Sequence, residues 1–302
     1  MKKVIVAGAS GFVGKHLVSK LLNEGIHVIA IVRKSSTSIE KLPQHENLNI
    51  VLVDTNIGAY RLDEIKEDDY DVFYNLAWVG AAGPKRADYN IQLDNIRMNL
   101  DYLMEAERLG CKKFIAVGTI GEYMAELALD KNIKSENFIY AISKNFTNKL
   151  LKVLEGKTKC RTIWCTLANL YGVGDTTGNL VSYTINNLLQ GKTPDFGPAE
   201  QPFDFLYITD CVEALYLLGE KETKSREFFL GSGNPKPLKD FLNQICQIVS
   251  PGTTLGIGNK PDDGTEYKYE WYNIDKLKEE TGFKPNYSFE EGINLIIKNA
   301  NK

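Results

Sequence analysis

The fold of this 302-residue chain is decided by Lys3-Val4-Ile5-Val6-Ala7-Gly8-Ala9-Ser10-Gly11-Phe12-Val13-Gly14. The apolar run predicts a strand, the three glycines predict a loop, and leucines at helical spacing up to Gly25 predict a helix. Loop amides and the helix N-terminus point at a phosphate, and the missing Cβ atoms let a pyrophosphate come close. The stretch therefore predicts a dinucleotide site formed by Gly8, Ser10, Gly11, Phe12, Val13 and Gly14.

A glycine triplet alone also occurs in ordinary turns, but strand-like apolar runs recur after this one and alternate with helical patterns. The further runs are His27–Val32, Leu48–Val53, Asp71–Ala77, Lys113–Val117, Thr162–Leu167 and Glu227–Leu230. This alternation predicts an α/β fold, a Rossmann-type doubly wound parallel sheet of about seven strands. From about Gly172 on, glycine and proline become more frequent. We therefore expect an NADP-binding domain over 1–170, with 203–231 returning to it, and a smaller, mainly substrate-binding region over 171–302.

Two helices stand out between these runs. One is expected over 88–109, and the other carries an apolar stripe at four-residue spacing, which indicates either core packing or a subunit interface. The stripe consists of Phe138, Ile142, Phe146, Leu150 and Leu154. A last helix is expected from Ser288, with Glu291 completing a capping box.

Composition excludes several function classes. The net charge of −3 argues against a dedicated nucleic-acid surface. No apolar run approaches the length of a membrane span, and glycine interrupts the first run too early for a signal peptide, so a cytosolic protein is expected. The five cysteines are scattered and predict neither a disulfide framework nor a metal site.

A candidate catalytic pair follows the fifth expected strand. Tyr140 and Lys144 lie one helical turn apart on one face. A free tyrosine has a pKa of about 10, and a nearby ammonium group lowers it, so the phenol can exchange a proton with a carbonyl or alcohol oxygen. The same pair also arises by chance on surface helices. Thr119, at the end of the fifth strand, can hydrogen-bond the same substrate oxygen.

Together these segments resemble the extended branch of the short-chain dehydrogenase/reductase superfamily, the NAD-dependent epimerase/dehydratase family, over nearly the whole chain. Gly8, Gly11 and Gly14 match its glycine spacing, and Thr119, Tyr140 and Lys144 match its Ser/Thr-Tyr-Lys set. The remaining matches are Asp54 after the third strand, Asn75-Leu76-Ala77-Trp78, Asn95 in the fourth helix and Asn169-Leu170-Tyr171-Gly172-Val173-Gly174.

The resemblance implies roles for these residues. Tyr140 would be the general acid or base, Lys144 would hold the nicotinamide ribose and lower the Tyr140 pKa, Thr119 would orient the oxygen, and Asn95 would support the proton path. Asp54, Leu76, Ala77 and Trp78 would contact the cofactor. Trp78, Thr119, Ile120, Gly121, Tyr140 and Asn169 would contact a nucleotide-sugar substrate. The helices at 88–109 and 135–154 would form a homodimer interface.

The end of the second strand bears on the choice of cofactor. NAD enzymes of this fold place an acidic residue there, whereas an arginine accommodates the 2′-phosphate of NADP. This chain has Arg33, Lys34 and Ser35 and no acid. NADP(H) is therefore favoured, with NAD(H) possible; a solvated basic turn would give the same sequence.

Three positions depart from the family pattern. Ile120-Gly121 replaces the Asp-Glu pair of the 4,6-dehydratases, so elimination of water is not expected. Phe203 and Thr166 stand where arginines are frequent in the family. The sequence therefore does not identify the residues that would bind the diphosphate. Cations that could compensate, or be plain surface charges, are Arg86, Arg97, Lys192 and Lys260.

Three functions remain at this point. The leading hypothesis is an NADPH-dependent reductase of a nucleotide-linked 4-keto-deoxysugar, because the segments 75–78 and 118–123 look most like bacterial 4-ketoreductases of the abequose-synthase type. A nucleotide-sugar 4-epimerase would use the same residues with tightly held NAD. A nonenzymatic dinucleotide sensor on this fold is the remote alternative. Such proteins commonly lose the Tyr/Lys pair, whereas this chain keeps it.

Overall fold

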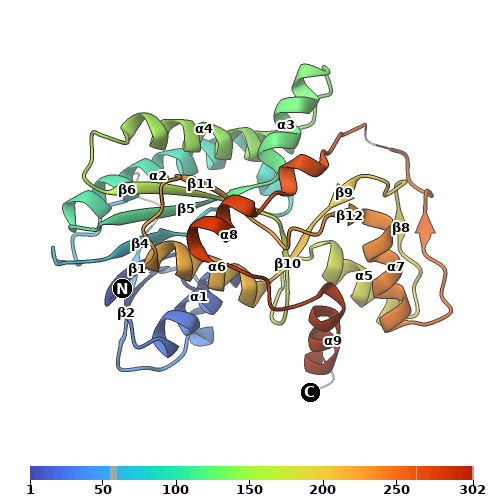
Figure 1. Cartoon of the computed structure of the whole chain (residues 1–302), viewed down its shortest axis with the longest axis horizontal. Helices are drawn as coiled ribbons and strands as arrows, with labels where there is room; N and C mark the ends of the chain where they lie inside the picture. Colours follow the sequence, from blue (N-terminus) through green and yellow to red (C-terminus); the bar gives the residue numbers. More distant parts are fainter. Residues whose placement is uncertain (55–59, 263, 301–302) are drawn as a thin grey trace.

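The computed structural model describes residues 1–54, 60–262 and 264–300. Its centre is a seven-stranded sheet in the order β11-β6-β5-β4-β1-β2-β3, in which every neighbouring pair is parallel (Figure 1). The strands are β1 (Lys3–Ala7), β2 (His27–Arg33), β3 (Leu48–Val53), β4 (Val72–Asn75), β5 (Lys113–Thr119), β6 (Arg161–Leu167) and β11 (Glu227–Leu230). The predicted α/β fold with a doubly wound parallel sheet is confirmed.

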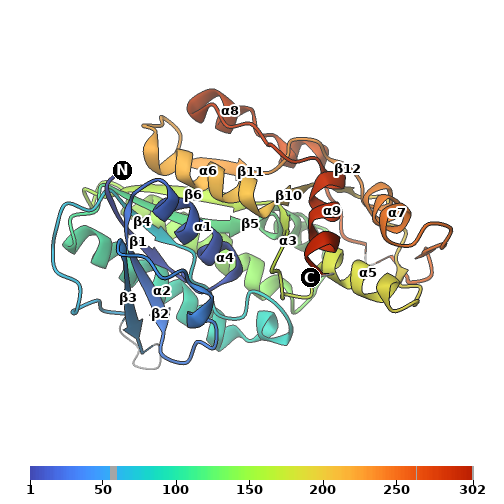
Figure 2. The same ribbon diagram turned by 90° about the horizontal axis from the view of Figure 1, so that it is seen from below.

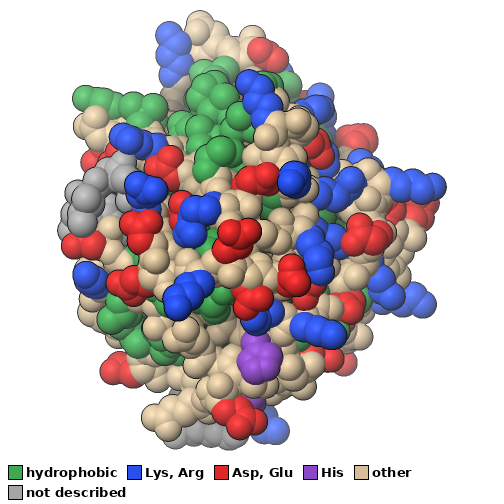
Figure 3. Space-filling model, turned by 90° about the vertical axis from the view of Figure 1, so that its left-hand side faces the viewer, with side chains coloured by type: hydrophobic (Ala, Val, Ile, Leu, Met, Phe, Trp, Pro, Cys, Tyr) green, Lys and Arg blue, Asp and Glu red, His purple; other side chains and the backbone are tan. Residues whose placement is uncertain are grey.

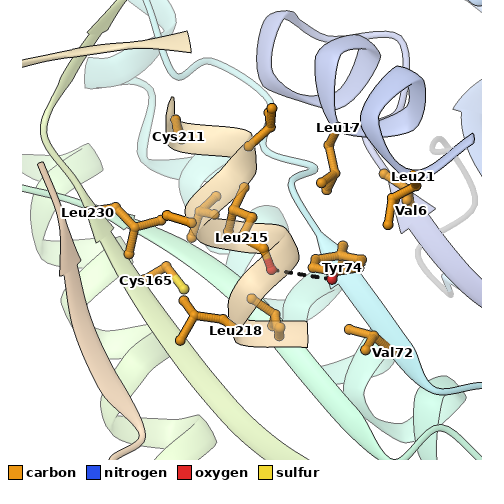
Figure 4. Close-up of a cluster of buried hydrophobic side chains, with 14 of the residues drawn as sticks. Val6, Leu17, Leu21, Val72, Tyr74, Cys165, Cys211, Leu215, Leu218 and Leu230 are labelled. Atoms are coloured by element: carbon orange, nitrogen blue, oxygen red, sulfur yellow. Dashed lines mark hydrogen bonds between the residues drawn. The ribbon is translucent and has the colours of Figure 1, made fainter. Parts of the chain in front are cut away.

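Helices cover both faces of the sheet. On one face, α1 (Phe12–Asn23) and α6 (Ile208–Glu220) pack against each other (Figure 2), and on the other, α2 (Tyr89–Arg108) packs against α4 (Phe138–Leu154). Leu17 and Leu21 of α1 and Leu215 and Leu218 of α6 belong to one buried cluster on this face of the sheet, where the Tyr74 hydroxyl donates to the Leu215 carbonyl oxygen at 3.3 Å (Figure 4). These buried leucines each contribute about 2 kcal/mol of hydrophobic stabilisation.

The region after β6 is built from short elements. Three two-stranded sheets pair β7 (Asn169–Tyr171) with β10 (Phe205–Tyr207), β9 (Pro202–Phe203) with β12 (Lys236–Pro237), and β8 (Asp195–Phe196) with β13 (Gly256–Ile257). The remaining helices are α3 (Gly121–Asp130), α5 (Leu180–Leu189), α7 (Leu238–Val249), α8 (Asp275–Thr281) and α9 (Phe289–Ala300), with single 3₁₀ turns η1 (Ile39–Lys41), η2 (Pro84–Ala87) and η3 (Tyr269–Tyr272). Helices α5, α7 and α9 enclose an apolar cluster of their own.

The capping box at the last helix has the predicted geometry. The Ser288 amide donates to Glu291 Oε2 at 2.8 Å, and the Glu291 amide donates to Ser288 Oγ at 3.2 Å. Each residue therefore satisfies the other's unpaired amide at the start of α9.

The apolar stripe on α4 is divided between the interior and the surface. Phe138 is buried, but Ile142 is 41% exposed and Phe146 is 50% exposed, so core packing does not explain these two. Tyr89 and Leu93 of the neighbouring α2 are exposed as well. Figure 3 shows hydrophobic side chains gathered in the upper part of one face of the molecule, above a belt of mixed charges. Within the described residues, no helix has the length and apolar character to cross a membrane.

Candidate active site

The glycine loop after β1 is tightly folded. Gly8 has φ +77°, and a Cβ there would lie 2.8 Å from the Ala77 amide nitrogen. A Cβ on Gly14 would collide with the Gly8 carbonyl oxygen, which already accepts the Gly11 amide at 3.0 Å. Helix α1 then starts at Phe12. The loop therefore leaves a cradle beside a helix N-terminus that fits a pyrophosphate, the group that the sequence predicts there.

A cavity of about 300 Å³ extends from this loop along the ends of β2 and β4. Eight of the predicted cofactor residues line it: Gly8, Ser10, Gly11, Arg33, Ser35, Leu76, Ala77 and Trp78. Residues that the sequence argument did not single out are Ser36, Thr37, Ser38, Val79, Met98 and Tyr102. The Ser10 and Ser36 hydroxyls lie 3.0 Å apart. Among the described residues that line the cavity there is no carboxylate.

The other predicted cofactor residues lie outside this lining. Phe12, Val13 and Gly14 belong to the first turn of α1. Lys34 and Asp54 line an adjoining cavity, which shares Val53 and Tyr102 with the first. Lys144 lies deeper, beneath Trp78.

The predicted catalytic residues meet at the inner end of this site. Lys144 is buried in α4; its Nζ donates to the Val117 carbonyl oxygen of β5 at 2.6 Å and lies 3.8 Å from the Trp78 ring centroid. Tyr140, one turn earlier, is 8% exposed, and its ring contacts the Trp78 ring edge-on, with centroids 6.0 Å apart. Burial raises the pKa of Tyr140 to about 12, against the opposing effects of the Arg86 charge and a hydrogen bond with Thr119.

Glu122 is a buried carboxylate that the sequence argument did not assign to the site. Its Oε1 accepts the Thr119 amide at 2.7 Å and its Oε2 accepts the Trp164 indole at 3.3 Å. A Cβ on Gly118 would collide with both Glu122 and Trp164, so the glycine makes room for the carboxylate. Burial raises the pKa of Glu122 and lowers that of Lys144, while each group's charge acts against the other's shift.

Asn95 of α2 is tied to the loop that follows β4. Its side-chain oxygen accepts the Val79 amide at 2.8 Å, and its side-chain nitrogen donates to the Val79 carbonyl oxygen at 2.8 Å. Gln92 holds the same loop by accepting the Trp78 indole at 2.8 Å. These contacts fix Trp78 against the predicted catalytic pair; the proton-path role of Asn95 also stays a prediction.

A second, larger cavity of about 780 Å³ opens on the other side of Thr119. It brings together Thr119, Ile120, Gly121 and Asn169, four of the predicted substrate residues. Arg86, Ser135, Phe203 and Tyr267 also line it. Of these four, only Arg86, as a possible compensating cation, and Phe203, as a departure from the family pattern, had been singled out from the sequence. Tyr140 connects to this cavity through Arg86, whose guanidinium carbon is 4.7 Å from the Tyr140 ring centroid.

This arrangement has the features of a dinucleotide-dependent enzyme, and the chain belongs to the NAD dependent epimerase/dehydratase family, whose model matches residues 4–231. The predicted membership is thereby confirmed. Among curated proteins, the chain is similar to the CDP-abequose synthase of Salmonella typhimurium, with 27% identity over 98% of this chain and 97% of that protein. It is also similar to the dTDP-4-dehydro-6-deoxyglucose reductase of Escherichia coli, with 23% identity over 98% and 96%.

Solved structures share the fold. The UDP-glucose 4-epimerase of Thermotoga maritima, determined with UDP-glucose, matches with a TM-score of 0.80 and 24% identity, over 99% of this chain and 98% of that one. The Bordetella bronchiseptica enzyme WbmF, determined with NADH, also has a TM-score of 0.80, with 21% identity over 99% and 92%.

Proposed function

We propose that this protein is an NADPH-dependent reductase of a nucleotide-linked 4-keto-deoxysugar. The observation that carries the proposal is that Tyr140 contacts a residue of each of two cavities, Trp78 of the one that begins at a pyrophosphate cradle and Arg86 of the larger one, which Thr119 also lines. The names of the two curated relatives, an abequose synthase and a 4-dehydro-deoxyglucose reductase, support the same class of reaction.

The residues of the chain supply placement and proton transfer. A bound nicotinamide dinucleotide supplies the hydride in this class of chemistry. Tyr140 gives its hydroxyl proton to the sugar oxygen as the carbonyl becomes an alcohol, and Thr119 hydrogen-bonds that oxygen. Lys144, held by Val117 and Trp78, binds the ribose and keeps positive charge behind the phenol.

The preference for NADP(H) rests on the ribose end of the first cavity. Arg33 and the hydroxyl-bearing run 35–38 line it together, and no carboxylate lies among the described lining residues to repel a 2′-phosphate. An arginine can bind such a phosphate through two parallel hydrogen bonds.

The remaining parts of the proposal concern reaction type and assembly. Ile120 and Gly121 offer no acid/base pair for elimination of water, which favours reduction over dehydration. We further propose a cytosolic homodimer joined through α2 and α4, whose outer faces carry exposed apolar side chains. The dinucleotide would be held by 1–170 and 203–231, and the sugar nucleotide mainly by 171–302.

The test begins with the nucleotide released from freshly purified, denatured protein, identified by chromatography. NADPH and NADH binding to the emptied protein is then compared, and 4-keto-6-deoxy sugars linked to UDP, CDP, dTDP and GDP are screened for NADPH oxidation. Preferential NADPH binding with turnover of one of these compounds is expected. Tightly retained NAD without net oxidation would overturn the reductase proposal and indicate an epimerase.

A further inference from the structure

Arg86 is placed over the catalytic tyrosine by the 3₁₀ turn η2. Its guanidinium carbon lies 4.7 Å from the Tyr140 ring centroid, a cation–π contact that holds the planar group against the phenol. The side chain is half-buried, and its Nε atom is buried with no hydrogen-bond partner. Within the described residues the guanidinium forms neither a hydrogen bond nor an ion pair. Such a group has its donors available for an acceptor that is not part of the chain.

The large cavity beside Arg86 has a net positive lining. Among the described residues that line it, Arg86 and Lys134 are the charged ones, and none is acidic. Asn169, Ser135 and Thr119 provide neutral polar groups around them. A cavity of this charge and size favours an anionic ligand over a neutral sugar.

The two positions at which the family resemblance leads us to expect arginines cannot supply this charge. Phe203 stands at the first; its ring contacts the rings of Phe205 and Tyr267, with centroids 5.4 and 5.8 Å apart. Thr166, at the second such position, is buried in β6. Phe203 and Tyr267 therefore give the cavity an aromatic part, and the guanidinium in its lining comes from η2.

We propose that Arg86 binds the diphosphate of the nucleotide-sugar substrate. This inference rests on the proposed function, because it assumes that the large cavity takes a nucleoside diphosphate. Arg86 forms charge-assisted hydrogen bonds to the phosphate oxygens. Its stacking on Tyr140 sets the distance between the bound diphosphate and the phenol, and so brings the sugar carbonyl to the proton donor.

The test measures binding and needs no turnover. UDP, CDP, dTDP and GDP are titrated by calorimetry into the protein saturated with NADP⁺, using wild type, Arg86→Met, Arg86→Lys and Lys192→Met. Lys192 is an exposed cation that contacts Gln190 and does not line the cavity, so it controls for loss of one positive charge. Circular dichroism and NADPH affinity verify that each variant is folded.

With the nucleoside diphosphate that wild type binds best, we expect Arg86→Met to weaken binding about ten- to a hundredfold, the effect of losing charged hydrogen bonds. Arg86→Lys should lie between wild type and Arg86→Met, and Lys192→Met should match wild type. Equal affinity of wild type and folded Arg86→Met would overturn the assignment of Arg86 and leave the proposed function standing. Failure of wild type to bind any of the four would instead remove the nucleotide-linked substrate, and this inference with it.

Discussion

The ammonium group of Lys144 lies over the face of Trp78, with Nζ 3.8 Å from the ring centroid. The edge-on contact between Trp78 and Tyr140 places the indole against both members of the proposed catalytic pair. Gln92 accepts a hydrogen bond from the indole N–H, and Asn95 accepts one from the amide of the following residue. The orientation of Lys144 therefore depends on a side chain from the loop after β4, as well as on its own helix.

Replacing Trp78 should remove the aromatic surface that orients Lys144. We expect Trp78→Ala to weaken NADPH binding about tenfold, in the range of a desolvated cation–π contact, because Lys144 loses the surface that orients it. Trp78→Phe keeps an aromatic face and should lose less. Nicotinamide fluorescence gives both dissociation constants, with Trp271→Ala as the control for loss of an indole. A Trp78→Ala protein that binds as tightly as wild type would show that Val117 alone orients Lys144.

Removing the Tyr140 hydroxyl should abolish proton transfer without emptying the cofactor site. We expect Tyr140→Phe to lower kcat about 10²- to 10⁴-fold, the usual contribution of a positioned general acid. NADPH affinity should stay within twofold, an estimate that follows because the ring still fills its place against Trp78. Steady-state kinetics on the identified substrate measure the first quantity and fluorescence titration the second. Unchanged turnover would disprove the catalytic assignment.

Glu122 should support the charge of Lys144. Burial lowers the pKa of Lys144 and the Glu122 carboxylate raises it, so Glu122→Gln should lower the Lys144 pKa further. The lysine then loses its proton at a lower pH, and the alkaline limb of NADPH binding shifts to lower pH. Glu227 also raises the Glu122 pKa, and the Glu122 charge in turn raises the Tyr140 pKa.

The control for this prediction lies on the same helix. Glu126, one turn further along α3, is exposed and contacts Asn145 and Lys149, so Glu126→Gln changes the same charge without reaching the site. NADPH dissociation constants between about pH 6 and 10, the range around the shifted pKa values, decide the outcome. Coincident profiles for Glu122→Gln and wild type would show that Glu122 does not support the charge of Lys144. Its role would then be limited to accepting the hydrogen bond from the Thr119 amide.

Arg33 should determine the preference between the two dinucleotides. We expect Arg33→Met to weaken NADPH binding about ten- to a hundredfold through loss of charged hydrogen bonds to the 2′-phosphate. NADH lacks this phosphate, so its affinity in the same variant is the internal control and should change little. Equal losses for NADPH and NADH, measured by fluorescence, would contradict the assignment of Arg33 to the phosphate.

The parallel sheet could be predicted because its signals are local. Each of the seven strands lies in a largely apolar run, and the glycine loop specifies its own geometry within seven residues. Apart from β11, the strands after Gly172 gave no such signal, because β8, β9, β12 and β13 are two residues long and too short for a period to show. The capping box at Ser288 was the exception, since its two residues lie within one turn.

The residues of the candidate site also differ in whether the sequence could predict them. Residues recognised from the sequence belong to contiguous motifs, whereas Arg86 and Glu122 acquire their roles through contacts with distant segments. Arg86 meets Tyr140 across 54 positions (140 − 86), and nothing near Arg86 distinguishes it from a surface cation. Glu122 contacts Trp164 of β6, and only its position beside Thr119 could have drawn notice. The hydroxyl run 35–38, which begins two residues after Arg33, was visible in the sequence.

The exposed apolar faces of α2 and α4 lead to a prediction about assembly. Phe146 is 50% exposed on α4, where Ile142 is exposed one turn earlier. If α2 and α4 pair with their copies around a twofold axis, Phe146→Asp places two like charges in an apolar contact, which strongly disfavours association. Light scattering at micromolar concentration should then give a dimer for wild type and a mass near 33.9 kDa for Phe146→Asp. Leu189→Asp, a change at an equally exposed leucine on α5, should remain dimeric. A wild-type mass of one chain would refute the homodimer, because these faces would then stay open to solvent.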